Sequence, residues 1–228
     1  VTMVSVVAGQ SGELWYGVAW SGHDLVATAV GPTQEAATAA VLGCVGRSVP
    51  TQTLRDVPPF VADIVQMLGD LEAGHEEGKH FTLSTEFVSA PMRSILHVAA
   101  AIPIGYVTTY GHVAQAARSQ ARPVGRAMAT NPLYPIVPCH RVLGADLKPV
   151  GYGGKQDEVA LEDKMGRISN ELRGYREETT IDVEQEKLIL YPCEWAIQAA
   201  AAEVDRLRRE ADRQQKTNAA EREQLRLF

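Results

Sequence analysis

The chain has 228 residues and a formal net charge of −6, with 45% hydrophobic and 22% charged residues. These proportions are ordinary for a globular protein, and the length allows one large or two small domains, each with its own core. No long apolar run predicts a membrane span, and the N-terminus lacks the basic region of a signal peptide. Three scattered cysteines do not suggest a disulfide framework, which favours a reducing, intracellular compartment.

The first 84 residues predict a small α+β unit. Strand-forming runs separated by turn residues, which predict antiparallel strands, lie at residues 2–8, 13–20 and 24–30. A helix capped by Thr33 is expected to place Cys44 in the core, and a second helix is expected over residues 58–71. The polar segment at residues 73–79 is typical of a linker.

The next region is predicted to be mainly helical. Apolar spacing predicts helices over residues 91–102 and 110–118, the second capped by one of the threonines at 108–109. A third helix is expected to begin at Pro123, which suits the first helical position and leaves Arg122 at the N-cap. Two short helices joined by a tight turn, with arginines on the second, are typical of a helix-turn-helix.

The charge is unevenly distributed along the chain. Residues 87–156 hold seven Lys or Arg residues against one acid, Asp146, a net charge of +6, which leaves −12 for the rest. A basic segment inside an acidic protein is typical of a surface that binds a polyanion. The alternative is a solvated face on which the charges cluster by chance.

Residues 176–228 are expected to form a C-terminal helical extension. A pattern that begins at Pro192 is rich in Ala and then in Arg, Glu and Gln, with an apolar stripe that fades toward the end. This stripe predicts a helix that packs on the body of the protein and has a solvated end. A coiled-coil or partner-binding arm is the alternative, but the heptad pattern is not sustained.

The motif with the clearest chemical meaning is Pro138-Cys139-His140-Arg141, which follows an apolar pair and whose cysteine lies eight residues after Asn131. A cysteine beside a histidine is a candidate activated thiolate, since the thiolate and not the thiol is the nucleophile. A small buried hydrophobic residue is the other interpretation of such a cysteine. The basic segment and the helix pair around the motif favour the reactive thiol.

Six blocks of residues occur in a fixed order over about residues 85–175. They are Ile102-Pro103-x-Gly105, Thr109-Tyr110-Gly111, Arg122-x-Val124-Gly125-x-Ala127-Met128, Asn131-Pro132, Pro138-Cys139-His140-Arg141-Val142 and Gly151-Tyr152-Gly153-Gly154. In order and spacing they resemble the O6-alkylguanine-DNA alkyltransferases, also called methylated-DNA–protein-cysteine methyltransferases. The N-terminal region is similar only in its coarse pattern of strands and helices.

The resemblance implies an α+β fold in three parts. A small N-terminal antiparallel sheet domain with helices, of the ribonuclease H-like kind, would cover residues 1–84. A mainly helical domain, which holds the helix-turn-helix and the active site, would cover residues 85–175. The C-terminal helical extension, residues 176–228, has no counterpart in the family.

The resemblance also implies a function in DNA repair. A methyl or other alkyl group would be transferred once from O6 of guanine, and from O4 of thymine, to Cys139, which would become S-alkylcysteine. No cofactor and no metal are expected. The partner would be double-stranded DNA that contains O6-alkylguanine, bound through the minor groove with low sequence specificity. We expect a monomer without membrane contact, whose C-terminal helix could offer further contacts, in the cytoplasm of a prokaryote or the nucleus of a eukaryote.

Four residues carry the implied chemistry at the acceptor. Cys139 needs a base because free cysteine is mostly protonated at neutral pH, and the family uses the adjacent histidine, here His140, through a bridging water. Asn131 would brace the turn before the cysteine through hydrogen bonds to the backbone. Tyr110 would donate a hydrogen bond to the leaving guanine as negative charge develops on it.

A glutamate orients the histidine in this family. It lies seven residues after a lysine on the helix that follows the glycine pair, which indicates Glu171, seven residues after Lys164. Glu158 and Glu162 are the alternatives, because reaching Glu171 requires a few extra residues after Gly154.

The target atom is buried in stacked DNA, so the nucleotide must be rotated out of the helix. Arg122 resembles the family's arginine finger, which fills the vacated space. The residues expected to contact DNA are Thr109, Tyr110, Arg122, Pro123, Gly125, Arg126 and Ala127. The expected walls of the substrate pocket are Tyr134, Val142, Tyr152 and Gly153.

Two positions depart from the family's pattern. Arg126 stands where a second glycine is common, and it would add a phosphate contact but crowd the groove. Tyr134 replaces a proline often found beside the alkyl group. Both positions bear on the size of the alkyl group that is accepted.

Two other classes of protein remain as alternatives. A non-catalytic lesion-binding protein of the alkyltransferase-like kind would look similar, but such proteins lack the acceptor cysteine. A Cys-His hydrolase would also use an activated thiol, but a directly adjacent Cys-His pair is awkward for direct proton transfer.

Overall fold

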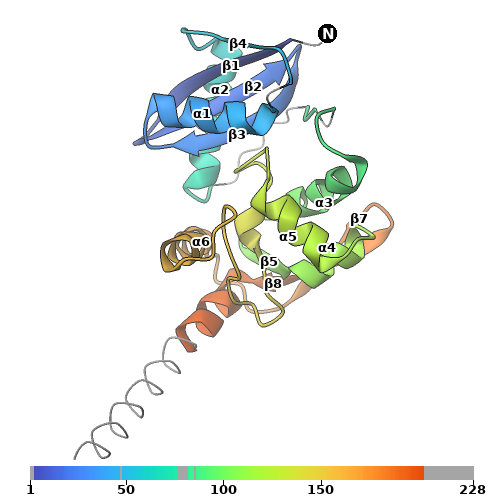
Figure 1. Cartoon of the computed structure of the whole chain (residues 1–228). Helices are drawn as coiled ribbons and strands as arrows, with labels where there is room; N and C mark the ends of the chain where they lie inside the picture. Colours follow the sequence, from blue (N-terminus) through green and yellow to red (C-terminus); the bar gives the residue numbers. More distant parts are fainter. Residues whose placement is uncertain (1–2, 47, 76–81, 85, 203–228) are drawn as a thin grey trace, which may run out of the picture.

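A computed structural model describes residues 3–46, 48–75, 82–84 and 86–202. They form two units, each with a four-stranded sheet, and the N-terminal unit lies above the second unit in Figure 1. The tail beyond residue 202, which holds most of the expected C-terminal helix, lies outside the described residues. Within the described ranges, no helix is long and apolar enough to cross a membrane.

The sheet of the N-terminal unit has the strand order β3-β2-β1-β4. Its strands are β1 (Val4–Ser11), β2 (Leu14–Ser21), β3 (Asp24–Gly31) and β4 (Thr51–Thr53). The prediction of three antiparallel strands is confirmed. Their tight turns use Gly12 and Gly22 at φ of 61° and 60°, in the left-handed region that favours glycine. The short exposed strand β4, parallel to β1, was not predicted.

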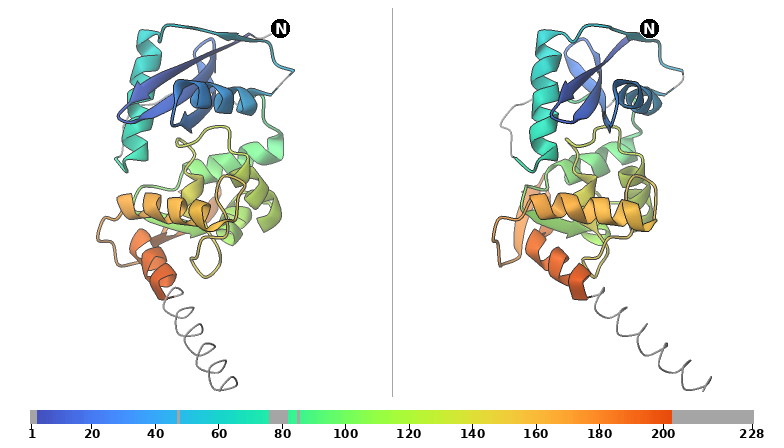
Figure 2. Two further views of the ribbon diagram at one scale, coloured as in Figure 1. Left: turned by 60° about the vertical axis from the view of Figure 1, so that its left-hand side comes forward. Right: turned by 90° about the vertical axis from the view of Figure 1, so that its left-hand side faces the viewer.

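Helices α1 (Gln34–Val45) and α2 (Pro59–Glu72) cover opposite faces of this sheet (Figure 2). Neighbouring residues of a strand point to opposite faces, so Val6 packs in the cluster beneath α1 and Val7 in the cluster beneath α2. Thr33 caps α1 as predicted. The placement of Cys44 in the core is wrong: Cys44 is exposed because it lies outside the buried stripe of α1.

The second unit combines helices with a sheet of strand order β6-β5-β8-β7. Its elements are α3 (Ala90–Ala100), β5 (Tyr106–Thr109), α4 (Tyr110–Ala116), α5 (Ala121–Ala129), the 3₁₀ turn η1 (Cys139–Arg141), β6 (Val142–Leu143), α6 (Glu158–Asn170), β7 (Thr179–Val183) and β8 (Glu186–Pro192). Residues 193–202 are helical. Thr109 caps α4, where its Oγ1 accepts a hydrogen bond from the backbone of His112 at 3.2 Å.

Two boundaries in this unit correct the sequence predictions. Helix α5 begins at Ala121 with Gln120 at the N-cap, so Arg122 lies within the first turn and Pro123 follows it, where its missing N–H is still harmless. The region after residue 175 is not wholly helical, because β7 and β8 form a hairpin and β8 pairs with β5. Buried and more exposed residues alternate regularly in this hairpin only from Leu188 onward, where Leu188 and Leu190 are buried.

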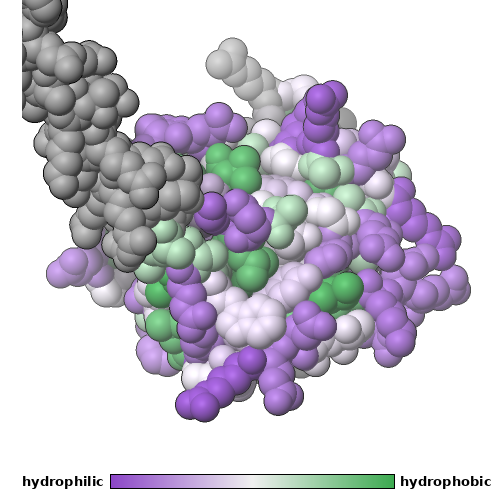
Figure 3. Space-filling view, turned by 90° about the horizontal axis from the view of Figure 1, so that it is seen from below, coloured by the Kyte–Doolittle hydropathy of each residue, from purple (hydrophilic) through white to green (hydrophobic). Residues whose placement is uncertain are grey.

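The surface of the second unit that faces away from the N-terminal unit mixes polar and apolar residues (Figure 3). On the part of this face that is coloured, hydrophobic residues form small separate patches among hydrophilic ones. The buried apolar residues of the second unit are instead collected in two internal clusters, a large one that includes α3, α4, α5 and the β7–β8 hairpin and a smaller one that includes β5, β6 and α6.

The loop between α5 and η1 contacts the N-terminal unit, and it leads directly into the turn η1, which carries Cys139. Thr28 on β3 donates two hydrogen bonds to this loop, from its backbone N–H to the Pro132 carbonyl at 2.8 Å and from its Oγ1 to the Tyr134 carbonyl at 2.7 Å. Ile136 packs against the apolar cluster beneath α2. The N-terminal sheet therefore fixes the path of the chain just before Cys139.

Replacing Thr28 with valine should destabilise the protein. Thr28 is buried, and the change leaves the Tyr134 carbonyl without its hydroxyl partner, so the free energy of unfolding should fall by about 1–3 kcal/mol in urea denaturation. Thr180→Val, at an exposed position of β7, is the matched control and should change stability by no more than about 0.5 kcal/mol. Equal stability of the two variants would contradict this role of Thr28.

Candidate active site

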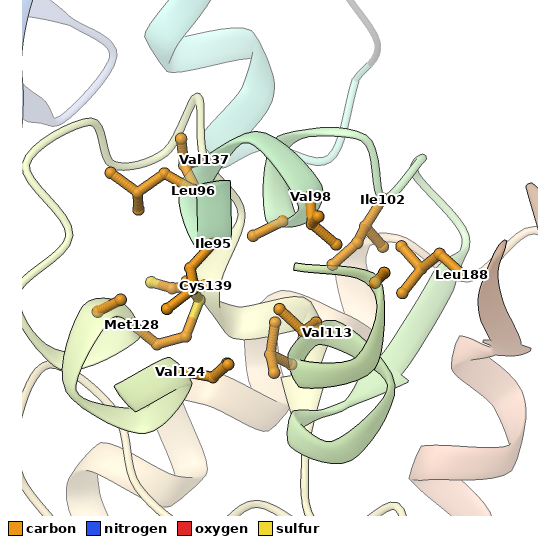
Figure 4. Close-up of a cluster of buried hydrophobic side chains, with 14 of the residues drawn as sticks. Ile95, Leu96, Val98, Ile102, Val113, Val124, Met128, Val137, Cys139 and Leu188 are labelled. Carbon is orange, nitrogen blue, oxygen red and sulfur yellow. The ribbon is translucent and has the colours of Figure 1, made fainter. Parts of the chain in front are cut away.

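Cys139 lies on the wall of a cavity of about 390 Å³ between α5 and the loop that precedes α6. Several residues predicted from the sequence line this cavity together: Tyr110, Arg122, Gly125, Cys139, Tyr152 and Gly153. Figure 4 shows the side chain of Cys139 beside that of Met128, at one side of the apolar cluster of the second unit. The thiol thus stands between a packed core and an open hollow.

Asn131 shapes the turn that presents the thiol. Its Nδ2 donates to the Val137 carbonyl at 2.7 Å, and its Oδ1 accepts from the backbone N–H of Leu133 at 3.0 Å. Cys139 itself is 6% exposed. Burial raises the pKa of the Cys139 thiol, and the hydrogen bond from Asn131 and the charge of Lys164 only partly oppose this effect. The resting thiol is therefore protonated at neutral pH.

The imidazole of His140 is held by Glu171, its predicted partner. Nε2 of His140 lies 2.8 Å from Oε1 of Glu171, and both side chains are buried. Burial raises the pKa of Glu171, but the hydrogen bonds from His140 and Arg141 outweigh it and hold this pKa at about 2, so the carboxylate is charged. The Nε2 atom therefore carries the proton, which leaves the Nδ1 lone pair available as a base. Among the described residues, Nδ1 of His140 has no hydrogen-bond partner.

Arg141 completes this cluster, although the sequence reasoning gave it no role. Its Nε and Nη2 atoms donate to the two carboxylate oxygens of Glu171 at 2.7 and 2.8 Å, and its Nη1 donates to the Ile102 carbonyl at 2.6 Å. A bidentate arginine–carboxylate pair is a strong and directional contact. Burial lowers the pKa of His140 and outweighs the opposing hydrogen bond and charge of Glu171, and the charges of Arg141 and Lys164 act in the same direction as burial, so the imidazole is neutral.

Helix α6 supplies Glu171 from its C-terminal end. Lys164, Ile168 and Glu171 are buried and follow one another at helical spacing, so they share the face that packs on η1. Glu158 and Glu162, the alternatives considered from the sequence, are exposed on the same helix. Of the three glutamates, Glu171 is the one that contacts His140.

Lys164 is a second buried residue whose contacts the sequence did not predict, because there it served only to locate Glu171. Its Nζ donates to the carbonyls of Val142 at 2.7 Å and Gly151 at 3.0 Å and lies 3.4 Å from the hydroxyl of Tyr110. Burial lowers the pKa of Lys164 to about 8, against the opposing charge of Cys139. Burial also raises the pKa of Tyr110 to about 12, so its phenol keeps its proton. The one feature that could have indicated a role for Lys164 is its place on the buried face of α6.

Helix α5 presents a basic edge beside the cavity. Arg122, Pro123 and Arg126 are exposed on it, and Gly125 lines the cavity. Ala127 does not belong to this edge, because it is 4% exposed and packs in the apolar cluster. The helical period turns the side chain at position 127 inward, and its expected DNA contact stays a prediction.

The four expected pocket walls fall in different places. Tyr152 and Gly153 line the cavity, whereas the side chain of Val142 is fully buried and only its carbonyl contacts Lys164. Tyr134 lies on the other side of the thiol, with its ring 6.3 Å from that of His140.

Comparison with known proteins places this site in a recognised family. The model of the family described as "6-O-methylguanine DNA methyltransferase, DNA binding domain" matches residues 90–171, the stretch from α3 to Glu171. A methylated-DNA–protein-cysteine methyltransferase of Mycolicibacterium paratuberculosis is 38% identical over 119 residues, which are 49% of this chain and 71% of that protein. A protein of the same name from Mycobacterium leprae is 43% identical over 72 residues, 31% of this chain and 41% of that protein.

The fold is also similar to solved structures. The crystal structure of O6-methylguanine-DNA methyltransferase from Pyrococcus kodakaraensis strain KOD1 superposes with a TM-score of 0.54. The identity is 26%, and the superposition covers 74% of this chain and 99% of that one. Both units of the present chain thus have a counterpart of the same architecture.

Acid should destabilise the protein through Glu171. Its pKa in the folded protein is about 2 against an ordinary value of 4.5, so it contributes stability that is present above about pH 4.5 and lost as pH falls toward 2. This shift corresponds to about 3 kcal/mol. In Glu171→Gln, the free energy of unfolding should be lower at neutral pH and should depend less on pH between 4.5 and 2. Denaturant unfolding across this range is the measurement, and Glu162→Gln, at an exposed position of α6, should behave like the parent.

Proposed function

The chain belongs to the methylated-DNA–protein-cysteine methyltransferase family, and on this premise we propose that it repairs DNA by taking an alkyl group from O6 of guanine onto Cys139. The observation that carries the proposal is the position of Cys139, which lies on the cavity wall next to a histidine that Glu171 holds in one tautomer. A nucleophile, a base and a group that orients the base are the parts that covalent transfer requires.

The transfer begins with removal of the thiol proton. Nδ1 of His140 takes this proton through a bridging water, and the charged Glu171 stabilises the imidazolium that forms. The Cys139 thiolate attacks the alkyl carbon, an S–C bond forms, and the C–O6 bond breaks with its electron pair leaving on the guanine. The S–C bond of the resulting thioether is stable and does not release the alkyl group, so each chain acts once.

Tyr110 and Lys164 assist the leaving group. The phenol of Tyr110 keeps its proton because its pKa is about 12, so it can donate a hydrogen bond to the guanine as negative charge develops there. Lys164 lies 3.4 Å from the Tyr110 hydroxyl and links it to the carbonyls of Val142 on β6 and of Gly151 in the loop before α6. The donor is therefore preorganised before the substrate arrives.

We propose double-stranded DNA that contains O6-alkylguanine as the partner. The cavity lies behind the exposed edge of α5, so the damaged nucleotide must leave the base stack to reach Cys139. Arg122 in the first turn of α5 would fill the vacated space, and Arg126 would contact phosphate from the minor-groove side. O4-alkylthymine is proposed as a second substrate and a monomer as the active species.

The alkyl transfer can be tested directly by mass spectrometry. Incubation with duplex DNA that contains O6-methylguanine should add the mass of one CH₂ group to Cys139, once per chain. Cys139→Ser should still bind the duplex but should gain no mass, since a serine hydroxyl is far less acidic than a thiol. Tight binding without mass gain in the parent chain would instead indicate a non-catalytic lesion-binding protein.

Rotation of the base can be tested with Arg122→Ala. Transfer from duplex DNA should slow about tenfold or more, which corresponds to a cost of at least about 1.4 kcal/mol. Transfer from a single strand with the same lesion should change much less, because no base pair has to be opened. Arg176→Ala removes an exposed arginine that lies outside α5 and does not line the cavity, and it should leave both rates unchanged. Equal slowing on both substrates would contradict a role in base rotation.

A further inference from the structure

The β7–β8 hairpin of the C-terminal extension lies beside α4, and its turn meets the turn that joins α4 to α5 (Figure 1). Nε of Arg118 donates to Oε1 of Glu186 at 2.9 Å, and Nη2 lies 2.8 Å from the same oxygen. A second polar contact joins Nε2 of His97 to Oε1 of Glu184 at 3.6 Å. The hairpin lies beyond residue 171, where the match to the family ends, so the family gives it no role.

The backbone of Arg118 has a conformation that is unfavourable for arginine. Its φ is 49°, in the left-handed region that glycine adopts more easily. The turn of a helix-turn-helix often contains glycine, and an arginine in this conformation costs energy that a glycine would not. Strained residues of this kind cluster at functional sites, so the side chain of Arg118 is a candidate for a binding role.

The position of Arg118 suits a contact with a DNA phosphate. In a helix-turn-helix the second helix enters the groove and the first crosses the backbone, so the turn between them comes close to phosphates. Arg118 lies three residues before α5, the helix whose exposed Arg122 and Arg126 are proposed above to contact DNA. Its side chain is 70% exposed, so a phosphate can reach the guanidinium without any change in the core.

The acidic hairpin competes for the same guanidinium. Residues 177–186 hold five acids and no Lys or Arg, whereas residues 87–156 carry a net charge of +6. A DNA backbone that approaches Arg118 is therefore repelled by Glu184 and Glu186. An exposed ion pair is weak, so a phosphate can replace Glu186 as the partner of Arg118.

A hollow separates the hairpin turn from the helices. This cavity of about 800 Å³ is lined by residues of α3, of the end of α4 and of the hairpin turn. Val183 and Leu188, on either side of the turn, are buried in the apolar cluster of the second unit and anchor the hairpin. Residues 184–186 between them are not buried, so they can shift away from Arg118 without exposing the core.

We propose, on the premise of the function proposed above, that Arg118 binds a phosphate of the DNA duplex and that Glu186 competes with DNA for its guanidinium. No covalent bond changes: the guanidinium exchanges a carboxylate for a phosphate. A phosphate contact carries no sequence information. The C-terminal extension thereby lowers the affinity for any duplex, damaged or not.

The phosphate contact is tested by equilibrium binding to two duplexes that differ only in one O6-methylguanine, over a range of salt concentrations. Every sample is the full chain with Cys139→Ser, so that no alkyl transfer disturbs the equilibrium. Arg118→Ala should weaken binding to both duplexes by the same factor and should lower the slope of log Kd against log salt by about 0.9, the value for one phosphate contact. Arg55→Ala, which removes an exposed arginine of the N-terminal unit, should leave this slope unchanged.

The competition is tested with Glu186→Gln, which should tighten binding about two- to fivefold, the range that corresponds to one exposed ion pair. Glu184→Gln is the matched control, because it removes the same charge from the same turn but leaves the contact with Arg118 intact. Its effect should be smaller. In chains that also carry Arg118→Ala, the two substitutions should have equal effects, since Glu186 then has no arginine to hold.

Three results would contradict the inference in different ways. An Arg118→Ala chain that binds both duplexes with the parent's affinity and slope would overturn the phosphate contact. Equal effects of Glu186→Gln and Glu184→Gln when Arg118 is present would overturn the competition. Alkyl transfer from the O6-methylguanine duplex is measured in parallel with Cys139 intact, and its absence would overturn the proposed function itself, and this inference with it.

Discussion

One buried carboxylate organises the second unit. Glu171 accepts hydrogen bonds from His140 and from two nitrogens of Arg141, and Arg141 also reaches the carbonyl of Ile102. A buried charge is tolerated only when it is paired and hydrogen-bonded. The end of α6, the turn η1 and the segment after α3 are therefore obliged to meet at this point. Burial keeps His140 neutral, and the contact with Glu171 gives it a defined tautomer, so the structural requirement and the chemical one are met at the same place.

The N-terminal unit has a part in this site although it holds none of the reacting groups. Thr28 fixes the loop before the acceptor cysteine through two hydrogen bonds, and Glu72 on α2 holds Tyr134 and Arg167 beside the thiol. A loop that carries catalytic residues needs a rigid support. The edge of the N-terminal sheet and the end of α2 supply that support, which explains why two units with separate cores pack against each other here.

Much of this arrangement could be predicted where local periodicity decides the outcome. The three strands of the first sheet and the cap at Thr33 follow from the local pattern of residues, and the cap of α4 was narrowed to Thr108 or Thr109. The pairing of His140 with Glu171 was implied by the family resemblance. Three features could not be predicted because they depend on which face a neighbouring element covers. Cys44 was assigned to the core wrongly, and the burial of the Ala127 side chain was not foreseen. The β7–β8 hairpin is stabilised by pairing with β5, a contact across more than eighty residues that no local pattern reveals.

The burial of Cys139 sets the order in which the site must act. Burial raises its pKa, so the resting thiol is a weak nucleophile and gains reactivity only when its proton has somewhere to go. His140 can take that proton because Glu171 fixes its proton on Nε2, and Glu171 can do so because Arg141 balances its charge. Reactivity is thus conferred by a chain of contacts that ends far from the sulfur in sequence. In the proposed reaction, which consumes Cys139 once, this arrangement is an advantage, since the thiol is not exposed as a free thiolate before its substrate arrives.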